Sequence, residues 1–331
     1  MSEAKKLHVA LFPWLAFGHM IPFFELAKLI AQRGHKISFI STPRNIQRLP
    51  KIPPNLAPLI NLVSLPLPTV EHLPQNAEAT TDIPSHKTPY LKIAFDGLQG
   101  PLHQFFQTST PDWIIYDFAP HWLPPILANL GISGVFFSMY GAWTLSFLGS
   151  STSAMINRED SRTRPEDFTV PPEWIPFPSK IAFGLHEAKR AFAIRNCNEL
   201  ESNFSRLVGE LHCKPVVPIG LLPPADFDGS SDQDDMWLTI KEWLDKQNKD
   251  QGLIARFFGE KMVGIEITKD EKDGSLRRES VAESLRLIMV EKEGRGYRDK
   301  AKEMKKLIAD KDMHDRYVDH FVEFMQNHRV A

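Results

Sequence analysis

Short apolar runs alternate with amphipathic stretches over the first two-thirds of the chain, and this order constrains the fold more than any other feature. The runs predict buried strands because they are short, rich in β-branched and aromatic residues, and bounded by glycine, proline or polar residues. The amphipathic stretches predict helices. Such alternation favours βαβ units, so we predict an α/β fold with a parallel sheet. Strands are expected at 7–12, 36–41, 60–65, 112–117, 134–138, 191–195 and 215–219, and helices at 21–32, 88–107, 121–130 and 199–211.

Length and composition exclude several classes of protein. The chain has 331 residues, enough for about two domains. Lys and Arg total 39 against 41 Asp and Glu, so no basic field is present to bind a nucleic-acid backbone. The two cysteines, Cys197 and Cys213, form no CxxC pair, which indicates neither a structural zinc site nor a disulfide framework.

Two stretches bear on the cellular location. The polar start and the short apolar run at 7–12 do not fit the apolar core of a secretory signal. Residues 118–157 contain no charged side chain, but prolines and glycines interrupt them, so we interpret them as a helix, a strand and another helix. We therefore expect a cytoplasmic protein with no stable membrane insertion.

The last third of the chain has a different character. Residues 223–235 are acidic and poor in apolar side chains, which predicts an exposed linker, and a short helix is expected at 236–247. Further helices are expected at 251–261, 280–290, 297–308 and 316–327, the second of them opened by a capping box at Ser280–Glu283. Residues 263–267 give the one strand signal here, and the charges of the last two helices indicate solvated faces.

His19 follows the first expected strand, in Gly18-His19-Met20-Ile21-Pro22. We expect it in the loop before the next helix, at the carboxyl edge of the sheet, where open α/β sheets bind ligands. Imidazole is the side chain best suited to take a proton near neutral pH. From its position alone, His19 is either a base at a ligand site or a residue that caps the helix or satisfies a backbone group.

Asp117 ends the fourth expected strand, and right-handed crossovers place it at the same edge as His19. A carboxylate that accepts a hydrogen bond from one imidazole nitrogen fixes the tautomer and leaves the other nitrogen free as a base. The alternative is that Asp117 caps the helix that follows Pro120. Ser138, at the end of the fifth strand, and His121 could also contact a ligand.

Motifs of three other enzyme classes are absent from the sequence. No GxGxxG follows the first strand, so dinucleotide binding is not supported there. Neither the GxSxG elbow of serine hydrolases nor the GxxxxGK[ST] phosphate-binding loop of nucleoside triphosphatases occurs.

Three segments together resemble the plant family-1 UDP-sugar glycosyltransferases. They are the strand at 7–12 with the motif around His19 and Arg33-Gly34-His35, then Pro111-Asp112-Trp113-Ile114-Ile115-Tyr116-Asp117, and finally Arg195-Asn196-Cys197-Asn198-Glu199-Leu200-Glu201. The resemblance covers 7–247 and resumes over 250–329. It is strongest with the branch that adds a sugar to an existing flavonoid or terpenoid glycoside.

The resemblance implies the GT-B fold, in which two Rossmann-like domains face each other across a cleft. It predicts an N-terminal Rossmann-like domain at 1–222 that binds the acceptor. An acidic linker and short helix at 223–249 and a truncated, mostly helical remnant of the UDP-sugar domain at 250–331 would follow. The catalytic base of the family corresponds to His19 and its partner to Asp117. His19 would deprotonate the acceptor hydroxyl, and a hexosyl group would be transferred with inversion as UDP leaves.

The same resemblance assigns the remaining site residues. UDP-sugar would be a co-substrate, and neither a cofactor nor a metal is expected. The acceptor, a flavonoid, a terpenoid or a glycoside of either, would contact Phe17, Phe118, His121, Ser138, Tyr140 and Trp143. The donor sugar would contact Gly18, Asp250 and Gln251.

The donor-binding box of the family is missing except for its end. The box begins with Trp-Ala-Pro-Gln, continues through His-Cys-Gly-Trp-Asn-Ser and closes with Asp-Gln, of which only Asp250-Gln251 is present. The 81 residues from Gln251 to Ala331 leave no room for a second doubly wound sheet, because each βαβ unit needs roughly 30 residues. The tail helices must then pack on the N-terminal domain or expose apolar faces.

We therefore expect UDP-sugar to bind weakly or not at all and activity to be impaired. The alternative is a non-catalytic acceptor-binding protein or a truncated gene product.

Overall fold

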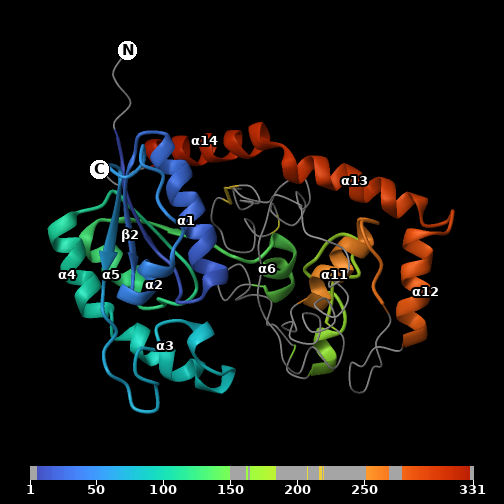
Figure 1. Cartoon of the computed structure of the whole chain (residues 1–331), viewed down its shortest axis with the longest axis horizontal. Helices are drawn as coiled ribbons and strands as arrows, with labels where there is room; N and C mark the ends of the chain where they lie inside the picture. The colour runs from blue at the N-terminus through green and yellow to red at the C-terminus, as the bar shows by residue number, and fades with distance from the viewer. Residues whose placement is uncertain are drawn as a thin grey trace. The chain divides into compact units, whose positions relative to one another are not determined.

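The computed structural model describes residues 6–149, 162, 165–183, 207, 216–217, 219, 251–267 and 278–328. They divide into two compact units, the first formed by Met1–Met139 with Met313–Ala331 and the second by Tyr140–Asp312. Figure 1 shows the described segments as ribbons. The predicted domain boundaries near 222 and 249 lie outside the described residues and stay predictions, as do the strand at 191–195 and the helix at 236–247. Of the helix at 199–211 only Leu207 is described, and it is helical; Val216, Val217 and Ile219 of the last predicted strand are not in a strand.

A five-stranded parallel sheet forms the centre of the first unit, in the order β3-β2-β1-β4-β5. All four pairings are parallel, so the carboxyl ends of the strands meet at one edge. The predicted α/β fold is confirmed, and each of the first five predicted strands is found within two residues of its expected ends. The strands are β1 (His8–Phe12), β2 (Lys36–Ser41), β3 (Ile60–Ser64), β4 (Trp113–Tyr116) and β5 (Ser133–Phe136).

Helix α1 (Phe17–Gln32) begins four residues earlier than predicted, so His19 lies in its first turn and not in a loop. The backbone amides of His19 and Met20 both donate to the Ala16 carbonyl and close this turn ahead of Pro22. The amphipathic pattern of the sequence had indicated a start at Ile21. The predicted stop is confirmed, since Gly34 takes the left-handed conformation that ends helices, with φ 82°.

Further helices cover both faces of the sheet, and Figure 1 shows α4 and α5 on one side and α1 with α14 on the other. The stretch predicted as a single helix at 88–107 forms two helices, because the chain turns at Gly97, a residue of low helix propensity. These helices of the first unit are α2 (Pro43–Arg48), α3 (Thr88–Asp96), α4 (Gln99–Ser109), α5 (Leu123–Leu130) and, at the end of the chain, α14 (Lys311–Asn327).

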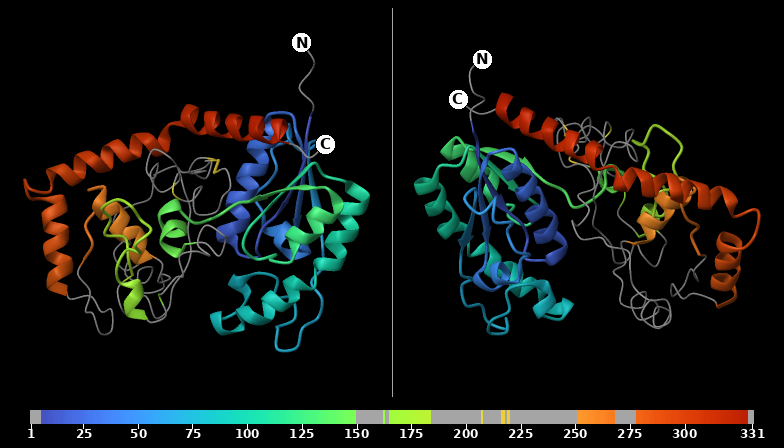
Figure 2. Two further views of the ribbon diagram at one scale, coloured as in Figure 1. Left: turned by 180° about the vertical axis from the view of Figure 1, so that it is seen from behind. Right: turned by 45° about the horizontal axis from the view of Figure 1, so that its top comes forward.

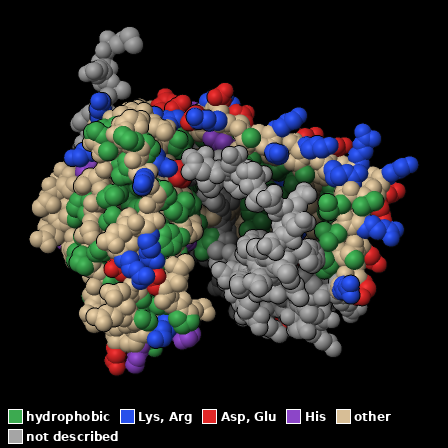
Figure 3. Space-filling model, in the orientation of Figure 1, with side chains coloured by type: hydrophobic (Ala, Val, Ile, Leu, Met, Phe, Trp, Pro, Cys, Tyr) green, Lys and Arg blue, Asp and Glu red, His purple; other side chains and the backbone are tan. Residues whose placement is uncertain are grey.

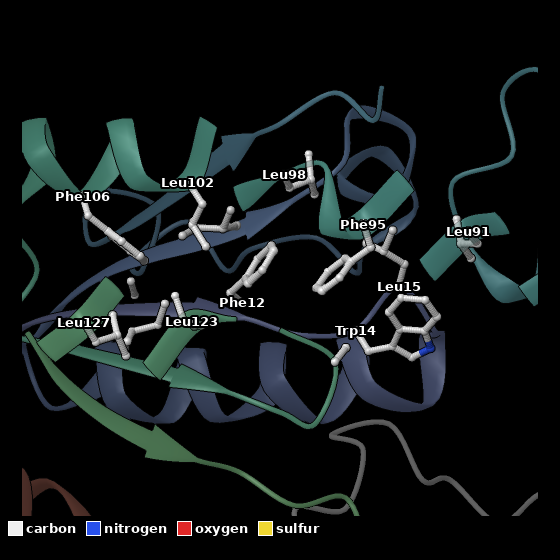
Figure 4. Packing of buried hydrophobic residues seen from close by; sticks show 14 of the residues in the cluster. Phe12, Trp14, Leu15, Leu91, Phe95, Leu98, Leu102, Phe106, Leu123 and Leu127 are labelled. Atoms are coloured by element: carbon white, nitrogen blue, oxygen red, sulfur yellow. The ribbon is translucent and has the colours of Figure 1, made fainter. Parts of the chain in front are cut away.

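The core on the α4 and α5 side is built around Phe12 of β1. Its ring stacks on Phe95 of α3 with a centroid distance of 4.8 Å. Figure 4 shows these two rings between leucine side chains of the surrounding helices. The cluster also buries Leu91, Leu98, Leu102, Phe106, Leu123 and Leu127. Burial of this apolar surface holds β1 and β4 in place, and both strands lead into the candidate site.

Helix α14 packs on the α1 side of the sheet. The Trp113 indole N–H of β4 donates to the Met325 carbonyl at 2.9 Å. Arg33, just after α1, forms an ion pair with Asp319 and donates to the Asp315 carbonyl at 2.7 Å. In Figures 1 and 2 the end of α14 lies beside α1. This part of the tail therefore packs on the N-terminal sheet, which is one of the two outcomes that the sequence left open.

In the second unit, the predicted helices after Asp250 are confirmed as α11 (Gln251–Glu260), α12 (Arg278–Met289) and α13 (Arg295–Ala309). Lys and Arg side chains gather along α13 in Figure 3, and Arg295 is 82% exposed, which confirms a solvated face. The predicted capping box is wrong, because α12 begins at Arg278 and Ser280 lies inside it. No helix among the described residues is both long and apolar enough to cross a membrane.

The predicted strand at 263–267 is also wrong, because these residues form a turn and an irregular segment. Met262 takes a left-handed backbone conformation with φ 55°. Its amide donates to the Gly259 carbonyl, and the Val263 amide donates to the Phe258 carbonyl. This pair of hydrogen bonds is the Schellman motif, so the start of the apolar run closes α11 instead of forming a strand.

The hydrogen bond between the Leu7 amide and His35 Nδ1, 3.0 Å long, makes the stability of the first unit depend on pH. Burial, with Lys6 and Arg33 nearby, lowers the pKa of His35 from 6.5. As the pH falls through 6.5 the unfolded chain takes up a proton and the folded imidazole does not, so the stability contributed by neutral His35 is complete above that pH and decreases below it. We expect the urea midpoint to fall between about pH 7.5 and about pH 5.5, and to fall less in His35→Asn, whose side-chain oxygen still accepts the Leu7 N–H. An equal fall in both proteins would contradict this account.

Candidate active site at the carboxyl edge of the sheet

His19 and Asp117 meet at the carboxyl edge of the sheet, as predicted. His19 Nδ1 lies 2.9 Å from Asp117 Oδ2. The His19 side chain is 14% exposed and that of Asp117 is 1% exposed, so the imidazole is open to a ligand while its partner is shielded from water. Asp117 does not cap the helix that follows, because α5 begins at Leu123 with Trp122 at its N-cap. The alternative interpretation of Asp117 as a helix cap is therefore wrong.

Asp117 orients the imidazole because its own carboxylate is held by the backbone. Oδ2 also accepts the Trp14 amide at 2.7 Å, and Oδ1 accepts the Ala119 amide at 3.0 Å. A carboxylate fixed in this way accepts the proton of His19 Nδ1. The neutral tautomer then has its acceptor lone pair on Nε2, the arrangement that a general base requires.

Aromatic rings border the imidazole. The ring of Phe118 lies 5.5 Å from that of His19 and 6.3 Å from that of Trp14, measured between centroids. Trp14 in turn packs edge-on against Phe95 in the core, at 5.2 Å. Phe118 is 46% exposed. The imidazole therefore stands beside an exposed apolar ring that is supported from the core, a surface suited to the ring system of an apolar ligand.

The other predicted acceptor residues are placed in different surroundings. Phe17 and Gly18 lie with His19 in the first turn of α1, Phe17 half-buried and Gly18 exposed. His121 is exposed and Ser138 half-buried, both in loops of the first unit.

Tyr140 and Trp143 belong to the second unit. Trp143, in α6 (Ala142–Leu148), is buried and stacks on Phe257 at 4.1 Å, so its ring is part of that unit's core. Its predicted contact with the acceptor stays a prediction.

The predicted donor residues have less structural support. Asp250 lies outside the described residues, and Gln251 is the first residue of α11, with its side chain also outside the description. Within the described ranges, no group of three or more His, Cys, Asp and Glu side chains could hold a metal ion.

Sequence reasoning missed two neighbours of the site. The backbone amide of Trp14 donates to Asp117. Its position in the loop directly after β1, at the carboxyl edge of the sheet, could have identified it as a neighbour of the site. Arg48 lies over the ring of Phe17, with its guanidinium carbon 5.0 Å from the ring centroid. No local pattern marks this residue, because the contact is between α1 and α2.

A parallel α/β sheet with a hydrogen-bonded histidine–aspartate couple at its carboxyl edge defines an α/β protein whose candidate site holds an oriented imidazole, a group suited to general-base chemistry. The chain is 37% identical over 449 aligned positions to UDP-glycosyltransferase 91C1 of Arabidopsis thaliana, with 97% of each chain covered. It is 29% identical over 470 positions to soyasaponin III rhamnosyltransferase of Glycine max, with 99% of this chain and 97% of the relative covered. No protein-family model matches the sequence.

A solved structure has a similar fold, that of UGT73P12 of Glycyrrhiza uralensis complexed with glycyrrhetinic acid 3-O-monoglucuronide. The TM-score is 0.65 at 15% identity, and 98% of this chain and 96% of that chain are covered. The chain belongs to the plant family-1 UDP-glycosyltransferases, enzymes of the GT-B fold that transfer a sugar from a UDP-sugar.

Replacing Asp117 by alanine is expected to destabilise the first unit, because the buried amides of Trp14 and Ala119 lose their acceptor. Each orphaned donor costs about 1–3 kcal/mol, so the free energy of unfolding falls by at least about 2 kcal/mol. Urea denaturation followed by tryptophan fluorescence measures this loss. His19→Ala, which leaves both amides bonded, is the control and should cost less. Equal losses in the two variants would show that Asp117 does not organise these loops.

Proposed function

We propose that His19 and Asp117 form the base couple of an inverting sugar transfer to a hydroxyl of a small plant metabolite. The 2.9 Å hydrogen bond between their side chains carries this proposal, because it directs Nε2 away from the carboxylate. Nε2 takes the proton of the acceptor hydroxyl, and the oxygen attacks the anomeric carbon of the UDP-hexose as the bond to UDP breaks. Attack opposite the leaving group inverts the configuration. Asp117 stabilises the imidazolium that forms.

The acceptor that we propose is a flavonoid or a terpenoid, or a glycoside of either. The name of the soyasaponin III rhamnosyltransferase describes a glycoside acceptor, and the solved UGT73P12 structure holds a glucuronide. In this chain the exposed ring of Phe118 beside His19 offers an apolar face for such a scaffold. The contacts proposed for this acceptor are Phe17, Phe118, His121, Ser138, Tyr140 and Trp143.

We propose further that donor binding is impaired. The 449 positions of the alignment with UDP-glycosyltransferase 91C1 exceed the 331 residues of this chain by 118, so at least that many positions of the relative have no counterpart here. The absence of most of the donor box from the sequence agrees with a missing internal block. Gly18, Asp250 and Gln251 are the proposed remaining contacts with the sugar. Acceptor binding without transfer is the second candidate function, and the same alignment favours it.

Calorimetric titration with UDP-glucose tests the donor half of the proposal. We expect a dissociation constant of about 1 mM or weaker, because the contacts of the missing box are lost. UDP-glycosyltransferase 91C1, titrated in parallel, is the control with a complete chain. A micromolar constant for this chain would contradict impaired donor binding.

Quenching of tryptophan fluorescence by quercetin 3-O-glucoside, a flavonol glycoside, tests the acceptor half. Phe118→Ala should weaken binding by roughly fivefold, because an aromatic contact beyond its buried area is worth about 1 kcal/mol. Phe136→Ala is the matched control, since Phe136 is 49% exposed in the same unit but packs on Tyr116. Equal weakening in both variants, or none in Phe118→Ala, would remove Phe118 from the acceptor surface.

His19→Ala tests the base directly. Any sugar transfer detected with concentrated UDP-glucose should fall by about a hundredfold or more, because general-base catalysis contributes that much. The measurement is product formation by liquid chromatography. His86→Ala, which changes an exposed histidine of the same unit that is not among the proposed site residues, is the control, and its activity should fall far less. Transfer that survives in His19→Ala would contradict the proposed base.

A further inference from the structure

A polar cluster lies beside the first turn of α1 and takes no part in the proposed proton transfer. Arg48, the last residue of α2, is its centre. Its two terminal nitrogens donate to the two oxygens of Asp82, each at 2.9 Å, and one of them also donates to Asn45 Oδ1 at 2.7 Å. Its Nε donates to the Arg44 carbonyl at 3.3 Å. A guanidinium held by a two-pronged ion pair and two further acceptors is fixed in one orientation.

Asp82, in the short 3-10 helix η1 (Thr80–Asp82), is itself held in place. Its Oδ2 accepts the amides of Glu78 at 3.0 Å and Ala79 at 2.9 Å. Burial raises the pKa of Asp82, but the hydrogen bonds from Arg48 and the two amides outweigh it, so the net shift is downward. The carboxylate is therefore ionised at neutral pH and balances the charge of Arg48. This balance argues against Arg48 as a binding site for a ligand anion.

Two contacts connect the cluster to α1 and to the loop before it. The Thr80 amide donates to the Leu15 carbonyl at 2.9 Å, which ties η1 to the loop before α1. The guanidinium carbon of Arg48 lies 5.0 Å from the ring centroid of Phe17, the first residue of α1. A guanidinium at this distance over an aromatic ring makes a favourable cation–π contact.

The first turn of α1 depends on such contacts because it has no side-chain cap. Its N-cap is Ala16, which has no oxygen to accept the first free amides. Three side chains of this turn contact other segments: Phe17 contacts Arg48, His19 contacts Asp117, and Met20 accepts the Ser41 hydroxyl at 3.5 Å. The contact between Phe17 and Arg48 lies at the first residue of the turn, where the side-chain cap is missing.

We propose that Arg48 is a positioning residue of the candidate active site: its guanidinium, fixed by Asp82 and Asn45, supports the ring of Phe17 and so fixes the turn that carries His19. The effect on acceptor binding rests on the proposed function, whereas the effect on the turn does not. Lysine cannot replace Arg48, because an ammonium group has neither the planar fork nor the flat face.

Hydrogen exchange of the full chain tests how the turn is held, with no ligand needed. In Arg48→Met the amides of residues 19–21 should exchange roughly threefold to tenfold faster, because the first turn opens more often. Arg44→Met is the matched control. Arg44 lies in the same helix and donates to the Asn76 carbonyl at 2.6 Å. One of its terminal nitrogens lies 3.5 Å from Asp82 Oδ1, but its described contacts do not include Phe17. Unchanged exchange at 19–21 in Arg48→Met would overturn the proposal.

The same comparison in a Phe17→Leu background separates positioning from general stability. If Arg48 acts through the ring, Arg48→Met changes exchange at 19–21 little once that ring is gone. If Arg48→Met accelerates amide exchange at 19–21 equally in both backgrounds, Arg48 acts only through its ion pair with Asp82, and the proposal is overturned.

Binding of quercetin 3-O-glucoside links the turn to function. Arg48→Met should weaken it severalfold while Arg44→Met leaves it near the unsubstituted value. If the unsubstituted chain does not bind this probe but the exchange results hold, the proposed acceptor is wrong and the positioning role stands. If the probe binds and both exchange and affinity are unchanged in Arg48→Met, the positioning role fails alone.

Discussion

The carboxylate of Asp117 is the interaction on which the candidate site depends. Its two oxygens accept an amide from the loop after β1, an amide from the loop after β4 and the imidazole of α1. These groups converge because β1 and β4 pair in parallel, with Phe12 opposite Tyr116 in the last register position. Asp117 follows Tyr116 directly, so the register of the sheet places the carboxylate next to the chain that leads into α1. A shift of one residue would turn Asp117 toward the other face of the sheet.

The parts of this arrangement that follow from local pattern could be predicted. The strands are apolar runs of the right length, and Gly34 marks the end of α1 because its left-handed backbone suits glycine. Parallel strands then bring His19 and Asp117 to one edge by topology alone. The distance between them, and the hydrogen bond from the Trp14 amide to Asp117, come from packing between segments about a hundred residues apart, which no local pattern records.

The wrong predictions have the same origin. The apolar run after α11 has the composition of a strand, but with no described neighbouring strand to pair with, its first residues close the helix through Met262 and Val263. The predicted contact of Trp143 with the acceptor stays a prediction, and the structure shows its ring stacked on Phe257, because aromatic side chains serve cores and pockets equally well. Composition therefore limits what such residues can do, and their tertiary partners decide between the possibilities.

Both residues of the proposed base couple, His19 and Asp117, belong to the first unit. The described partners of His19 and Asp117, namely Trp14, Phe118 and Ala119, all belong to the first unit. Helix α14 packs on that unit through hydrogen bonds from Arg33 and Trp113. The first unit therefore holds a packed sheet, an oriented imidazole and the aromatic ring beside it. The proposed loss of donor binding and the proposed acceptor contacts are compatible in one molecule, because we propose that they depend on different residues.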